Sequence, residues 1–164
     1  LNMIHEGTHG IQALDLLGRK AVMQQGAAIA LFGRELQATV AQARARPALA
    51  AHAEALQAAW GEVLVTLAVL TPLLRSDGDR ALANASVFLE AFGHTVLAWT
   101  WLRQAVVADG ALAQAATPQD ADFYRGKLQA CRWFFHWELP RTVPQHALLR
   151  SLDDSTLAMQ DAWF

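Results

Sequence analysis

An acidic residue between two histidines is the stretch of this sequence with the most specific chemistry. In residues 3–20, MIHEGTHGIQALDLLGRK, Glu6 follows His5 and precedes Gly7, Thr8 and His9. A carboxylate there can act as a general base if a water-poor, apolar site raises its pKa. It can also be structural, with Thr8 accepting from the first-turn amides and the acid favoured by the positive helix end. The residue types alone favour the structural role.

Zinc binding is the second chemistry that this stretch suggests. His5 and His9 are four residues apart with Glu6 between them, which resembles the H-E-x-x-H arrangement. Gly7 and Thr8 are poor residues for the interior of a helix, and no third ligand follows at a useful spacing. We therefore predict no metal site. The remaining histidines are expected to be partly buried or at the surface: His52, His94, His136 and His146.

An aromatic cluster near the end of the chain could be taken for a cofactor site. Aromatic residues at helical spacing more often pack in a core, so we expect core or subunit contacts here. The sequence contains no Gly-rich phosphate loop, nucleophile elbow or paired-cysteine motif. The cluster consists of Trp133, Phe134, Phe135 and Trp137.

Composition limits the classes of protein that this chain can belong to. Its 164 residues suffice for one domain with a core, and 54% are hydrophobic and 17% charged. The net charge of -2 argues against nucleic-acid binding. No stretch of roughly 18 residues is continuously apolar and uncharged, so no membrane span is expected. The single cysteine, Cys131, suits a reducing compartment, and we expect the cytoplasm.

Because the chain opens at Leu1 within a motif, we interpret it as part of a longer protein.

Apolar residues recur in steps of three and four along the whole chain, and this predicts an all-α fold. We expect an up-down four-helix bundle, preceded by a short helix and followed by a short helical tail over residues 144–163. The third stripe breaks at Arg103 and resumes at Val106. The stripes cover residues 29–40, 49–74, 82–99 and 124–135.

Local signals mark the ends of these helices. Residues 46–47 separate the first two, and residues 76–79 combine a stop with new capping oxygens. Gly110 follows the third stripe. Thr117–Asp120 is a strong start, with Pro118 at the first helical position. Residues 139–140, Leu-Pro, are expected to end the fourth helix.

Glycines inside the helical stripes predict positions where helices approach closely, since each costs up to ~1 kcal/mol relative to Ala. These are Gly33, Gly61, Gly93 and Gly126.

The segment Ile4–Gln12, IHEGTHGIQ, resembles the catalytic segment of the flavin-dependent acyl-CoA dehydrogenases. Residues 13–20, ALDLLGRK, are similar to the branch with an extra helical C-terminal domain, which includes enzymes acting on methylmercaptopropionyl-CoA. The resemblance implies that residues 1–25 end the catalytic helical domain and that residues 26–164 form the C-terminal extension.

The resemblance also implies a reaction and its residues. Glu6 would be the general base, Gly7 would lie against the substrate, and Thr8, His9 and Gly10 would approach FAD. An acyl-CoA would lose its α-proton to Glu6 and its β-hydrogen as hydride to the flavin, giving a 2-enoyl-CoA. Electron-transfer flavoprotein is the implied acceptor and a homo-oligomer the implied assembly. The chain by itself is expected to be inactive and to lack FAD.

Two other interpretations stay open. One is a non-catalytic helical interaction domain, which suits the apolar composition and six tryptophans. The other is the DNA-associated alkylation-response branch of the same superfamily. The balanced charge argues against that branch, because nonspecific DNA binding needs clustered Lys and Arg.

Overall fold

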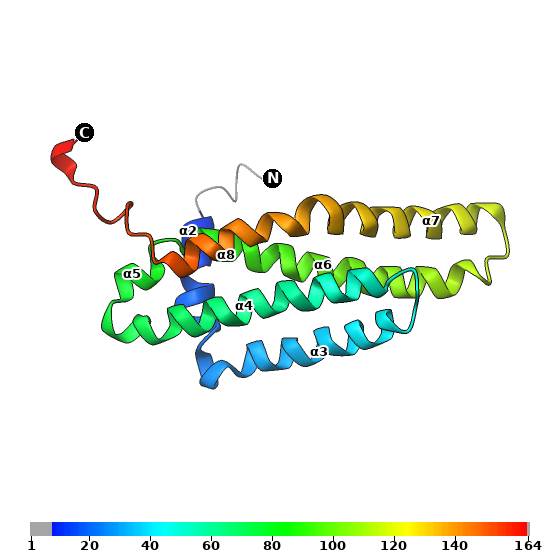
Figure 1. The fold of residues 1–164 in the computed structure, drawn as a ribbon, viewed down its shortest axis with the longest axis horizontal. Coiled ribbons are helices and arrows are strands. Elements are labelled where there is room, and N and C mark those ends of the chain that lie inside the picture. Colours follow the sequence, from blue (N-terminus) through cyan, green and yellow to red (C-terminus); the bar gives the residue numbers. More distant parts are fainter. Residues whose placement is uncertain (1–7, 164) are drawn as a thin grey trace.

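The structure, a computed structural model, describes residues 8–163, and this part of the chain is helical without a strand (Figure 1). The all-α prediction is confirmed. In chain order the elements are α2 (His9–Asp15), the π-helical turn η1 (Leu16–Lys20), the 3-10 turn η2 (Met23–Gly26), α3 (Ala27–Arg44), α4 (Ala50–Ser76), α5 (Gly78–Leu82), α6 (Ala85–Leu112), α7 (Pro118–Trp133), the π-helical turn η3 (Phe134–Glu138), the 3-10 turn η4 (Leu139–Arg141), α8 (Thr142–Ser151) and the 3-10 turn η5 (Asp161–Trp163).

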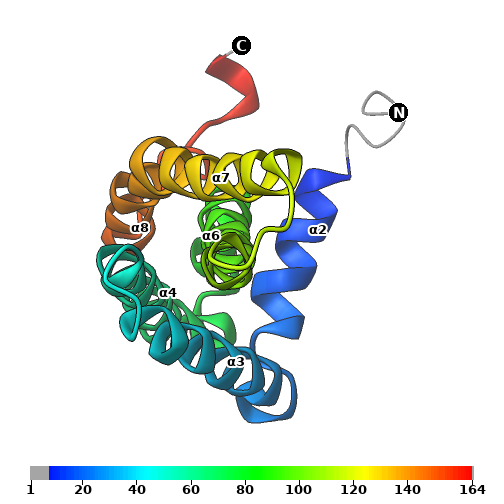
Figure 2. The ribbon, with the colours of Figure 1, turned by 90° about the vertical axis from the view of Figure 1, so that its right-hand side faces the viewer.

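The long helices alternate in direction, with α3, α4 and α6 followed by α7 and α8 as one returning rod (Figure 1). The short helix α2 crosses the long axis of the bundle. Helix α6 lies in the middle and contacts α2, α3, α4, α7 and α8 (Figure 2). The predicted bundle with a short leading helix is therefore confirmed, with α6 as its central member.

The innermost face of α6 differs from the stripe expected over residues 82–99. The stripe placed Leu89, Phe92 and Trp99 on the buried face, but these three side chains are only half-buried. A helix surrounded by five others buries more than one face, and alanine lets those neighbours approach closely. Arg103 does not interrupt α6, which is continuous. Its fully enclosed positions are Phe88, Ala91, Thr95, Ala98, Leu102 and Ala105.

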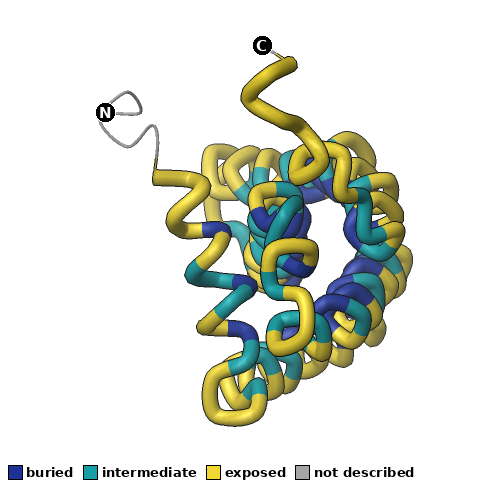
Figure 3. The backbone as a smooth tube through the Cα atoms, turned by 90° about the vertical axis from the view of Figure 1, so that its left-hand side faces the viewer, coloured by how far each residue is buried: buried dark blue, intermediate teal, exposed yellow. Residues whose placement is uncertain are grey.

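Helix α4 follows the predicted stripe closely, and its buried residues face the inside of the bundle (Figure 3). By length and hydropathy it is the one described helix that could cross a membrane, with 39% of its most apolar window buried. The core helix of a bundle meets the same criteria. The buried positions are Ala53, Leu56, Ala59, Trp60, Val63, Thr66, Leu67 and Leu70.

Most of the expected helix boundaries are confirmed. Thr117 caps α7 by accepting a hydrogen bond from the Asp120 amide at 3.1 Å, with Pro118 at the first helical position. Asp77 caps α5 by accepting from the Arg80 amide at 3.3 Å. Both caps satisfy amides that the first helical turn leaves without partners. Helix α6, however, continues past Gly110 to Leu112.

The prediction that residues 139–140 end the fourth helix is wrong. The chain stays helical from Pro118 to Ser151, but it passes through η3 and η4 between α7 and α8. Proline lacks an amide hydrogen and its ring clashes with the preceding turn, and the change of helical register surrounds Pro140. The expected tail is shorter, because α8 stops at Ser151 and Leu152 is left-handed with φ 56°.

Only one of the four expected close-contact glycines is confirmed. A Cβ added at Gly33 would lie 3.3 Å from the Trp60 indole. At Gly61, Gly93 and Gly126 an added Cβ would meet nothing within 4 Å. The spacing put these three on helices but could not say which faces would be covered.

We expect Gly61→Ala to raise the free energy of unfolding by ~0.5–1 kcal/mol, since alanine costs less entropy in a helix and meets no neighbour here. Gly33→Ala is the matched control and should gain less, because its methyl group presses on Trp60. Urea unfolding measures both. Equal stabilisation of the two variants would contradict the close contact at Gly33.

Candidate functional site

The structure describes three of the five residues expected at the catalytic site. Glu6 and Gly7 lie outside the described residues, so their predicted roles stay predictions. Thr8 precedes α2 and its carbonyl accepts from the Gln12 amide at 2.9 Å. Its side chain makes no capping hydrogen bond to α2, so that part of the structural interpretation is wrong. His9 and Gly10 form the first turn, and all three residues are exposed.

The buried side of α2 fixes where this exposed end lies. Ala13 of α2 and Leu17 of the following turn η1 are fully enclosed and belong to the common core, and α2 packs on α6. Ile11 and Leu14, by contrast, are 68% and 48% exposed. Helix α2 is thus held by the bundle on one side and presents apolar side chains outward on the other.

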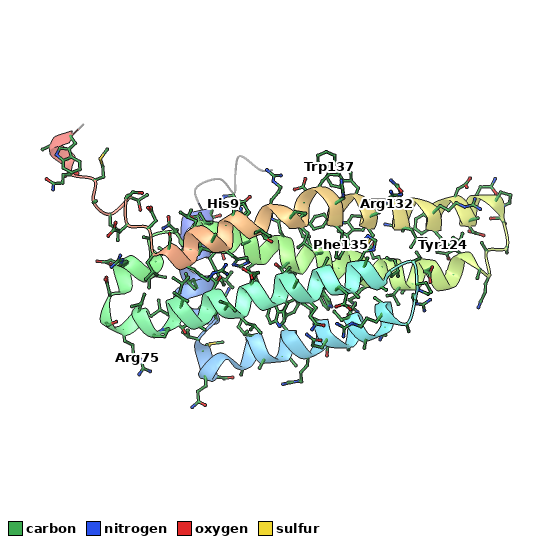
Figure 4. All side chains as sticks on the ribbon, viewed as in Figure 1. His9, Arg75, Tyr124, Arg132, Phe135 and Trp137 are labelled. Atoms are coloured by element: carbon green, nitrogen blue, oxygen red, sulfur yellow. The ribbon has the colours of Figure 1, made fainter. Side chains whose placement is uncertain are left out.

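A groove of about 480 Å³ lies between the start of α2 and the first half of α6. His9 of α2 lines this groove, and Figure 4 shows His9 near the N-terminal end of the described chain. Leu97 is 50% exposed, and Gly93 leaves open space where a side chain would stand. The groove therefore joins the described end of the motif to an uncovered part of α6. Its α6 residues are Ser86, Leu89, Glu90, Gly93, His94 and Leu97.

Polar contacts connect this groove to the rod of α7 and α8. His94 Nδ1 lies 2.9 Å from the Glu90 carbonyl oxygen, and its Nε2 lies 3.5 Å from Glu138 Oε2. The same Glu138 oxygen accepts from Arg141 at 2.9 Å. The spacing of Glu138 and Arg141 by three residues was the available signal, whereas nothing in the sequence indicated His94.

A second polar cluster joins α4 to α8 inside the bundle. His146 is fully enclosed, and its Nδ1 lies 2.9 Å from Thr66 Oγ1. Arg150 pairs with Glu62 at 2.6 Å beside it. Burial lowers the pKa of His146, which favours the neutral ring. The contact between His146 and Thr66 is enclosed, and the Glu62–Arg150 pair beside it is half-buried, so we assign the cluster to packing rather than to chemistry.

The remaining candidates give no reactive group. Among residues 8–163, no three His, Cys, Asp or Glu side chains lie close enough to hold a metal ion. Burial raises the pKa of Cys131 to about 12, so its thiol stays protonated. Phe134 and Phe135 are buried as expected, but Trp133 and Trp137 are 51% and 62% exposed.

Comparison with known proteins identifies the class. Residues 32–160 match the acetyl-CoA dehydrogenase C-terminal-like family, and the chain belongs to it. The chain is 28% identical to the broad-specificity linear acyl-CoA dehydrogenase FadE5 of Mycobacterium tuberculosis, over 100% of this chain and 28% of that protein. It is 30% identical to the 3-methylmercaptopropionyl-CoA dehydrogenase of Ruegeria pomeroyi, over 94% of this chain and 26% of that protein. The chain thus spans about a quarter of these relatives, and the family resemblance is confirmed.

The buried histidine gives a pH dependence that can be measured. Because burial lowers the folded pKa of His146 below the unfolded value near 6.5, the unfolded chain binds more protons below that pH. Stability is therefore present above pH 6.5 and lost as pH falls. We expect the free energy of unfolding of His146→Gln to fall less between pH 7.5 and 5.5 than that of the unaltered protein. The exposed His136→Gln control should keep the full loss; an identical loss in all three proteins would contradict this.

Proposed function

We propose that this chain is the C-terminal part of an FAD-dependent acyl-CoA dehydrogenase that converts an acyl-CoA thioester to the 2-enoyl-CoA. The observation that carries the proposal is similarity over the whole chain, residue 6 included, to an acyl-CoA dehydrogenase. The match to the C-terminal-like family supports the position of the chain within such an enzyme.

Glu6 is the proposed general base, and it takes the α-proton of the thioester. Its carboxylate must be desolvated for this, since an apolar, water-poor site raises its pKa toward the working pH. Gly7 has no side chain and lets the acyl chain approach the backbone. When bound, FAD supplies the acceptor for the hydride from the β-carbon.

Thr8, His9 and Gly10 are the proposed contacts to the flavin. Their exposure supports this role, and so does Gly10, where an added Cβ would meet nothing within 4 Å. The described residues therefore leave room for a flat group along this backbone. The groove beside His9 extends the same open surface onto α6.

We propose that residues 1–25 end the catalytic helical domain and that residues 26–164 are the C-terminal extension. Three successive residues with positive φ support a boundary there: Gln24 at 50°, Gln25 at 58° and Gly26 at 81°. Non-glycine residues seldom adopt this conformation, and the chain turns here from the crosswise α2 into α3 along the bundle (Figure 1). The core contacts of α2 with α6 would hold the two parts together.

The extension itself would serve packing and assembly. Ile11 and Leu14 on α2 and Leu97 on α6 are exposed apolar side chains that a further domain of the enzyme would cover. We further propose a homo-oligomer in the cytoplasm, with electron-transfer flavoprotein as the electron acceptor.

In the enzyme that carries this segment, Glu6→Gln should slow reduction of the flavin by acyl-CoA by at least ~10²- to 10⁴-fold, because the amide keeps the shape and removes the base. Rapid-mixing spectroscopy follows the reduction. Flavin content and thermal unfolding should stay close to those of the unaltered enzyme. If Glu6 were instead a structural cap, its loss would lower the free energy of unfolding by roughly 1 kcal/mol. Reduction at an unchanged rate would mean that Glu6 is not the base.

The 164-residue chain alone should neither retain FAD nor oxidise acyl-CoA, because Thr8–Gly10 offer one exposed strip and no enclosing wall. Absorbance near the flavin band after purification with added FAD tests this. Stoichiometric, slowly released flavin would contradict the proposal that other domains complete the site.

A further inference from the structure

A hollow of about 740 Å³ lies between the first half of α4 and the end of α7. Sites for small molecules are typically ~300–1,000 Å³. The α4 side of the hollow consists of Ala51, His52 and Ala55, and the short alanine side chains leave space. On the other side, the aromatic residues of α7 and η3 form a wall. We call this space the α4–α7 hollow and define it by Ala51, His52, Ala55, Arg132, Trp133 and Trp137.

The π-helical turn η3 gives this wall its shape. Phe135 points between α7 and α4, whereas Trp137 points away from the bundle (Figure 4). The Phe135 ring meets the His52 ring edge-on, with centroids 4.9 Å apart. Trp133 and Trp137 stay 51% and 62% exposed at the rim. Such π-helical turns within helices are frequent at functional sites.

Two polar groups of the hollow have no hydrogen-bond or ion-pair partner among the described residues. His52 Nδ1 is buried without a hydrogen bond there, and Arg132 makes no ion pair with residues 8–163. No carboxylate lines the hollow. Burial, and then the nearby Arg132 charge, lower the pKa of His52 and favour its neutral ring. Arg132 is left as an uncompensated positive charge beside exposed indoles.

We propose that the α4–α7 hollow binds a nucleotide, with its base against the Trp133 and Trp137 indoles and its phosphate on Arg132. Indole faces stack on any base, and a guanidinium matches a phosphate with two parallel hydrogen bonds. A nucleotide brings an aromatic ring and an anion together in one molecule, which matches the exposed indoles and the Arg132 guanidinium. The proposal is independent of the dehydrogenase activity.

Titration calorimetry of the protein with AMP tests the proposal. We expect saturable binding, with adenosine and inorganic phosphate each at least tenfold weaker. Arg132→Gln should weaken AMP binding at least tenfold and leave adenosine binding unchanged. Trp137→Ala should weaken both. Ala51→Leu changes no charge and should abolish binding by filling the hollow from an exposed helical position.

Matched controls separate the hollow from general surface effects. Trp163 is 62% exposed, as Trp137 is, but lies in η5, and Trp163→Ala should leave AMP affinity unchanged. Arg125→Gln removes a guanidinium of α7 that pairs with Asp122 and should also have no effect. Circular dichroism confirms that each variant is folded.

Several outcomes would overturn the proposal. If phosphate bound as tightly as AMP, the hollow would be an anion site only. An unchanged AMP affinity in Trp137→Ala would show that the base does not stack on this indole. Absence of AMP binding together with a changed sedimentation coefficient in Trp137→Ala would make the hollow a protein contact. Adenosine 3′,5′-bisphosphate distinguishes the source: tighter binding than AMP supports the nucleotide end of coenzyme A, and equal binding supports a 5′-nucleotide.

Discussion

Packing of five helices around α6 is the interaction on which the rest of this fold depends. Phe88 and Leu102 are fully enclosed, and burying a large apolar side chain contributes roughly 1.5–3 kcal/mol. The alanines between them let α7 and the other neighbours approach closely. Because α2, α3, α4, α7 and α8 all contact α6, each is positioned relative to the others through this one helix.

This central helix also determines how the motif at the start of the chain is presented. Ala13 of α2 and Leu17 of η1 anchor this part of the chain on the core, while Thr8, His9 and Gly10 remain outside it. Helix α2 therefore has one side fixed by the core and one open side. Under the proposed function, that open side would form one wall of a catalytic site that further domains complete.

The rod of α7 and α8 shows how a helix accommodates conflicting requirements. It must bury Phe134, Phe135 and Leu139 on the same side and still pass Pro140. The π-helical turn η3 widens the register before the proline, and the 3-10 turn η4 tightens it again. As a result Glu138 meets His94 of α6, and Trp137 is left on the outside.

The sequence by itself determined the helical class, most helix boundaries and the buried face of α4. These features depend on residues within one or two turns of each other, as with the Thr117 cap of α7 and the repeat along α4. The motif around Glu6 was likewise recognisable from residue types alone, and the family it indicated is the family to which the chain belongs.

Only the tertiary structure decided which helix is central, which glycine is covered and how the chain passes Pro140. It also decided the partners of polar residues, since Thr66 meets His146 from 80 positions away and Glu62 meets Arg150 from 88. Spacing places a residue on a face of its own helix. Whether another helix covers that face depends on surfaces distant in sequence, and no local pattern contains that information.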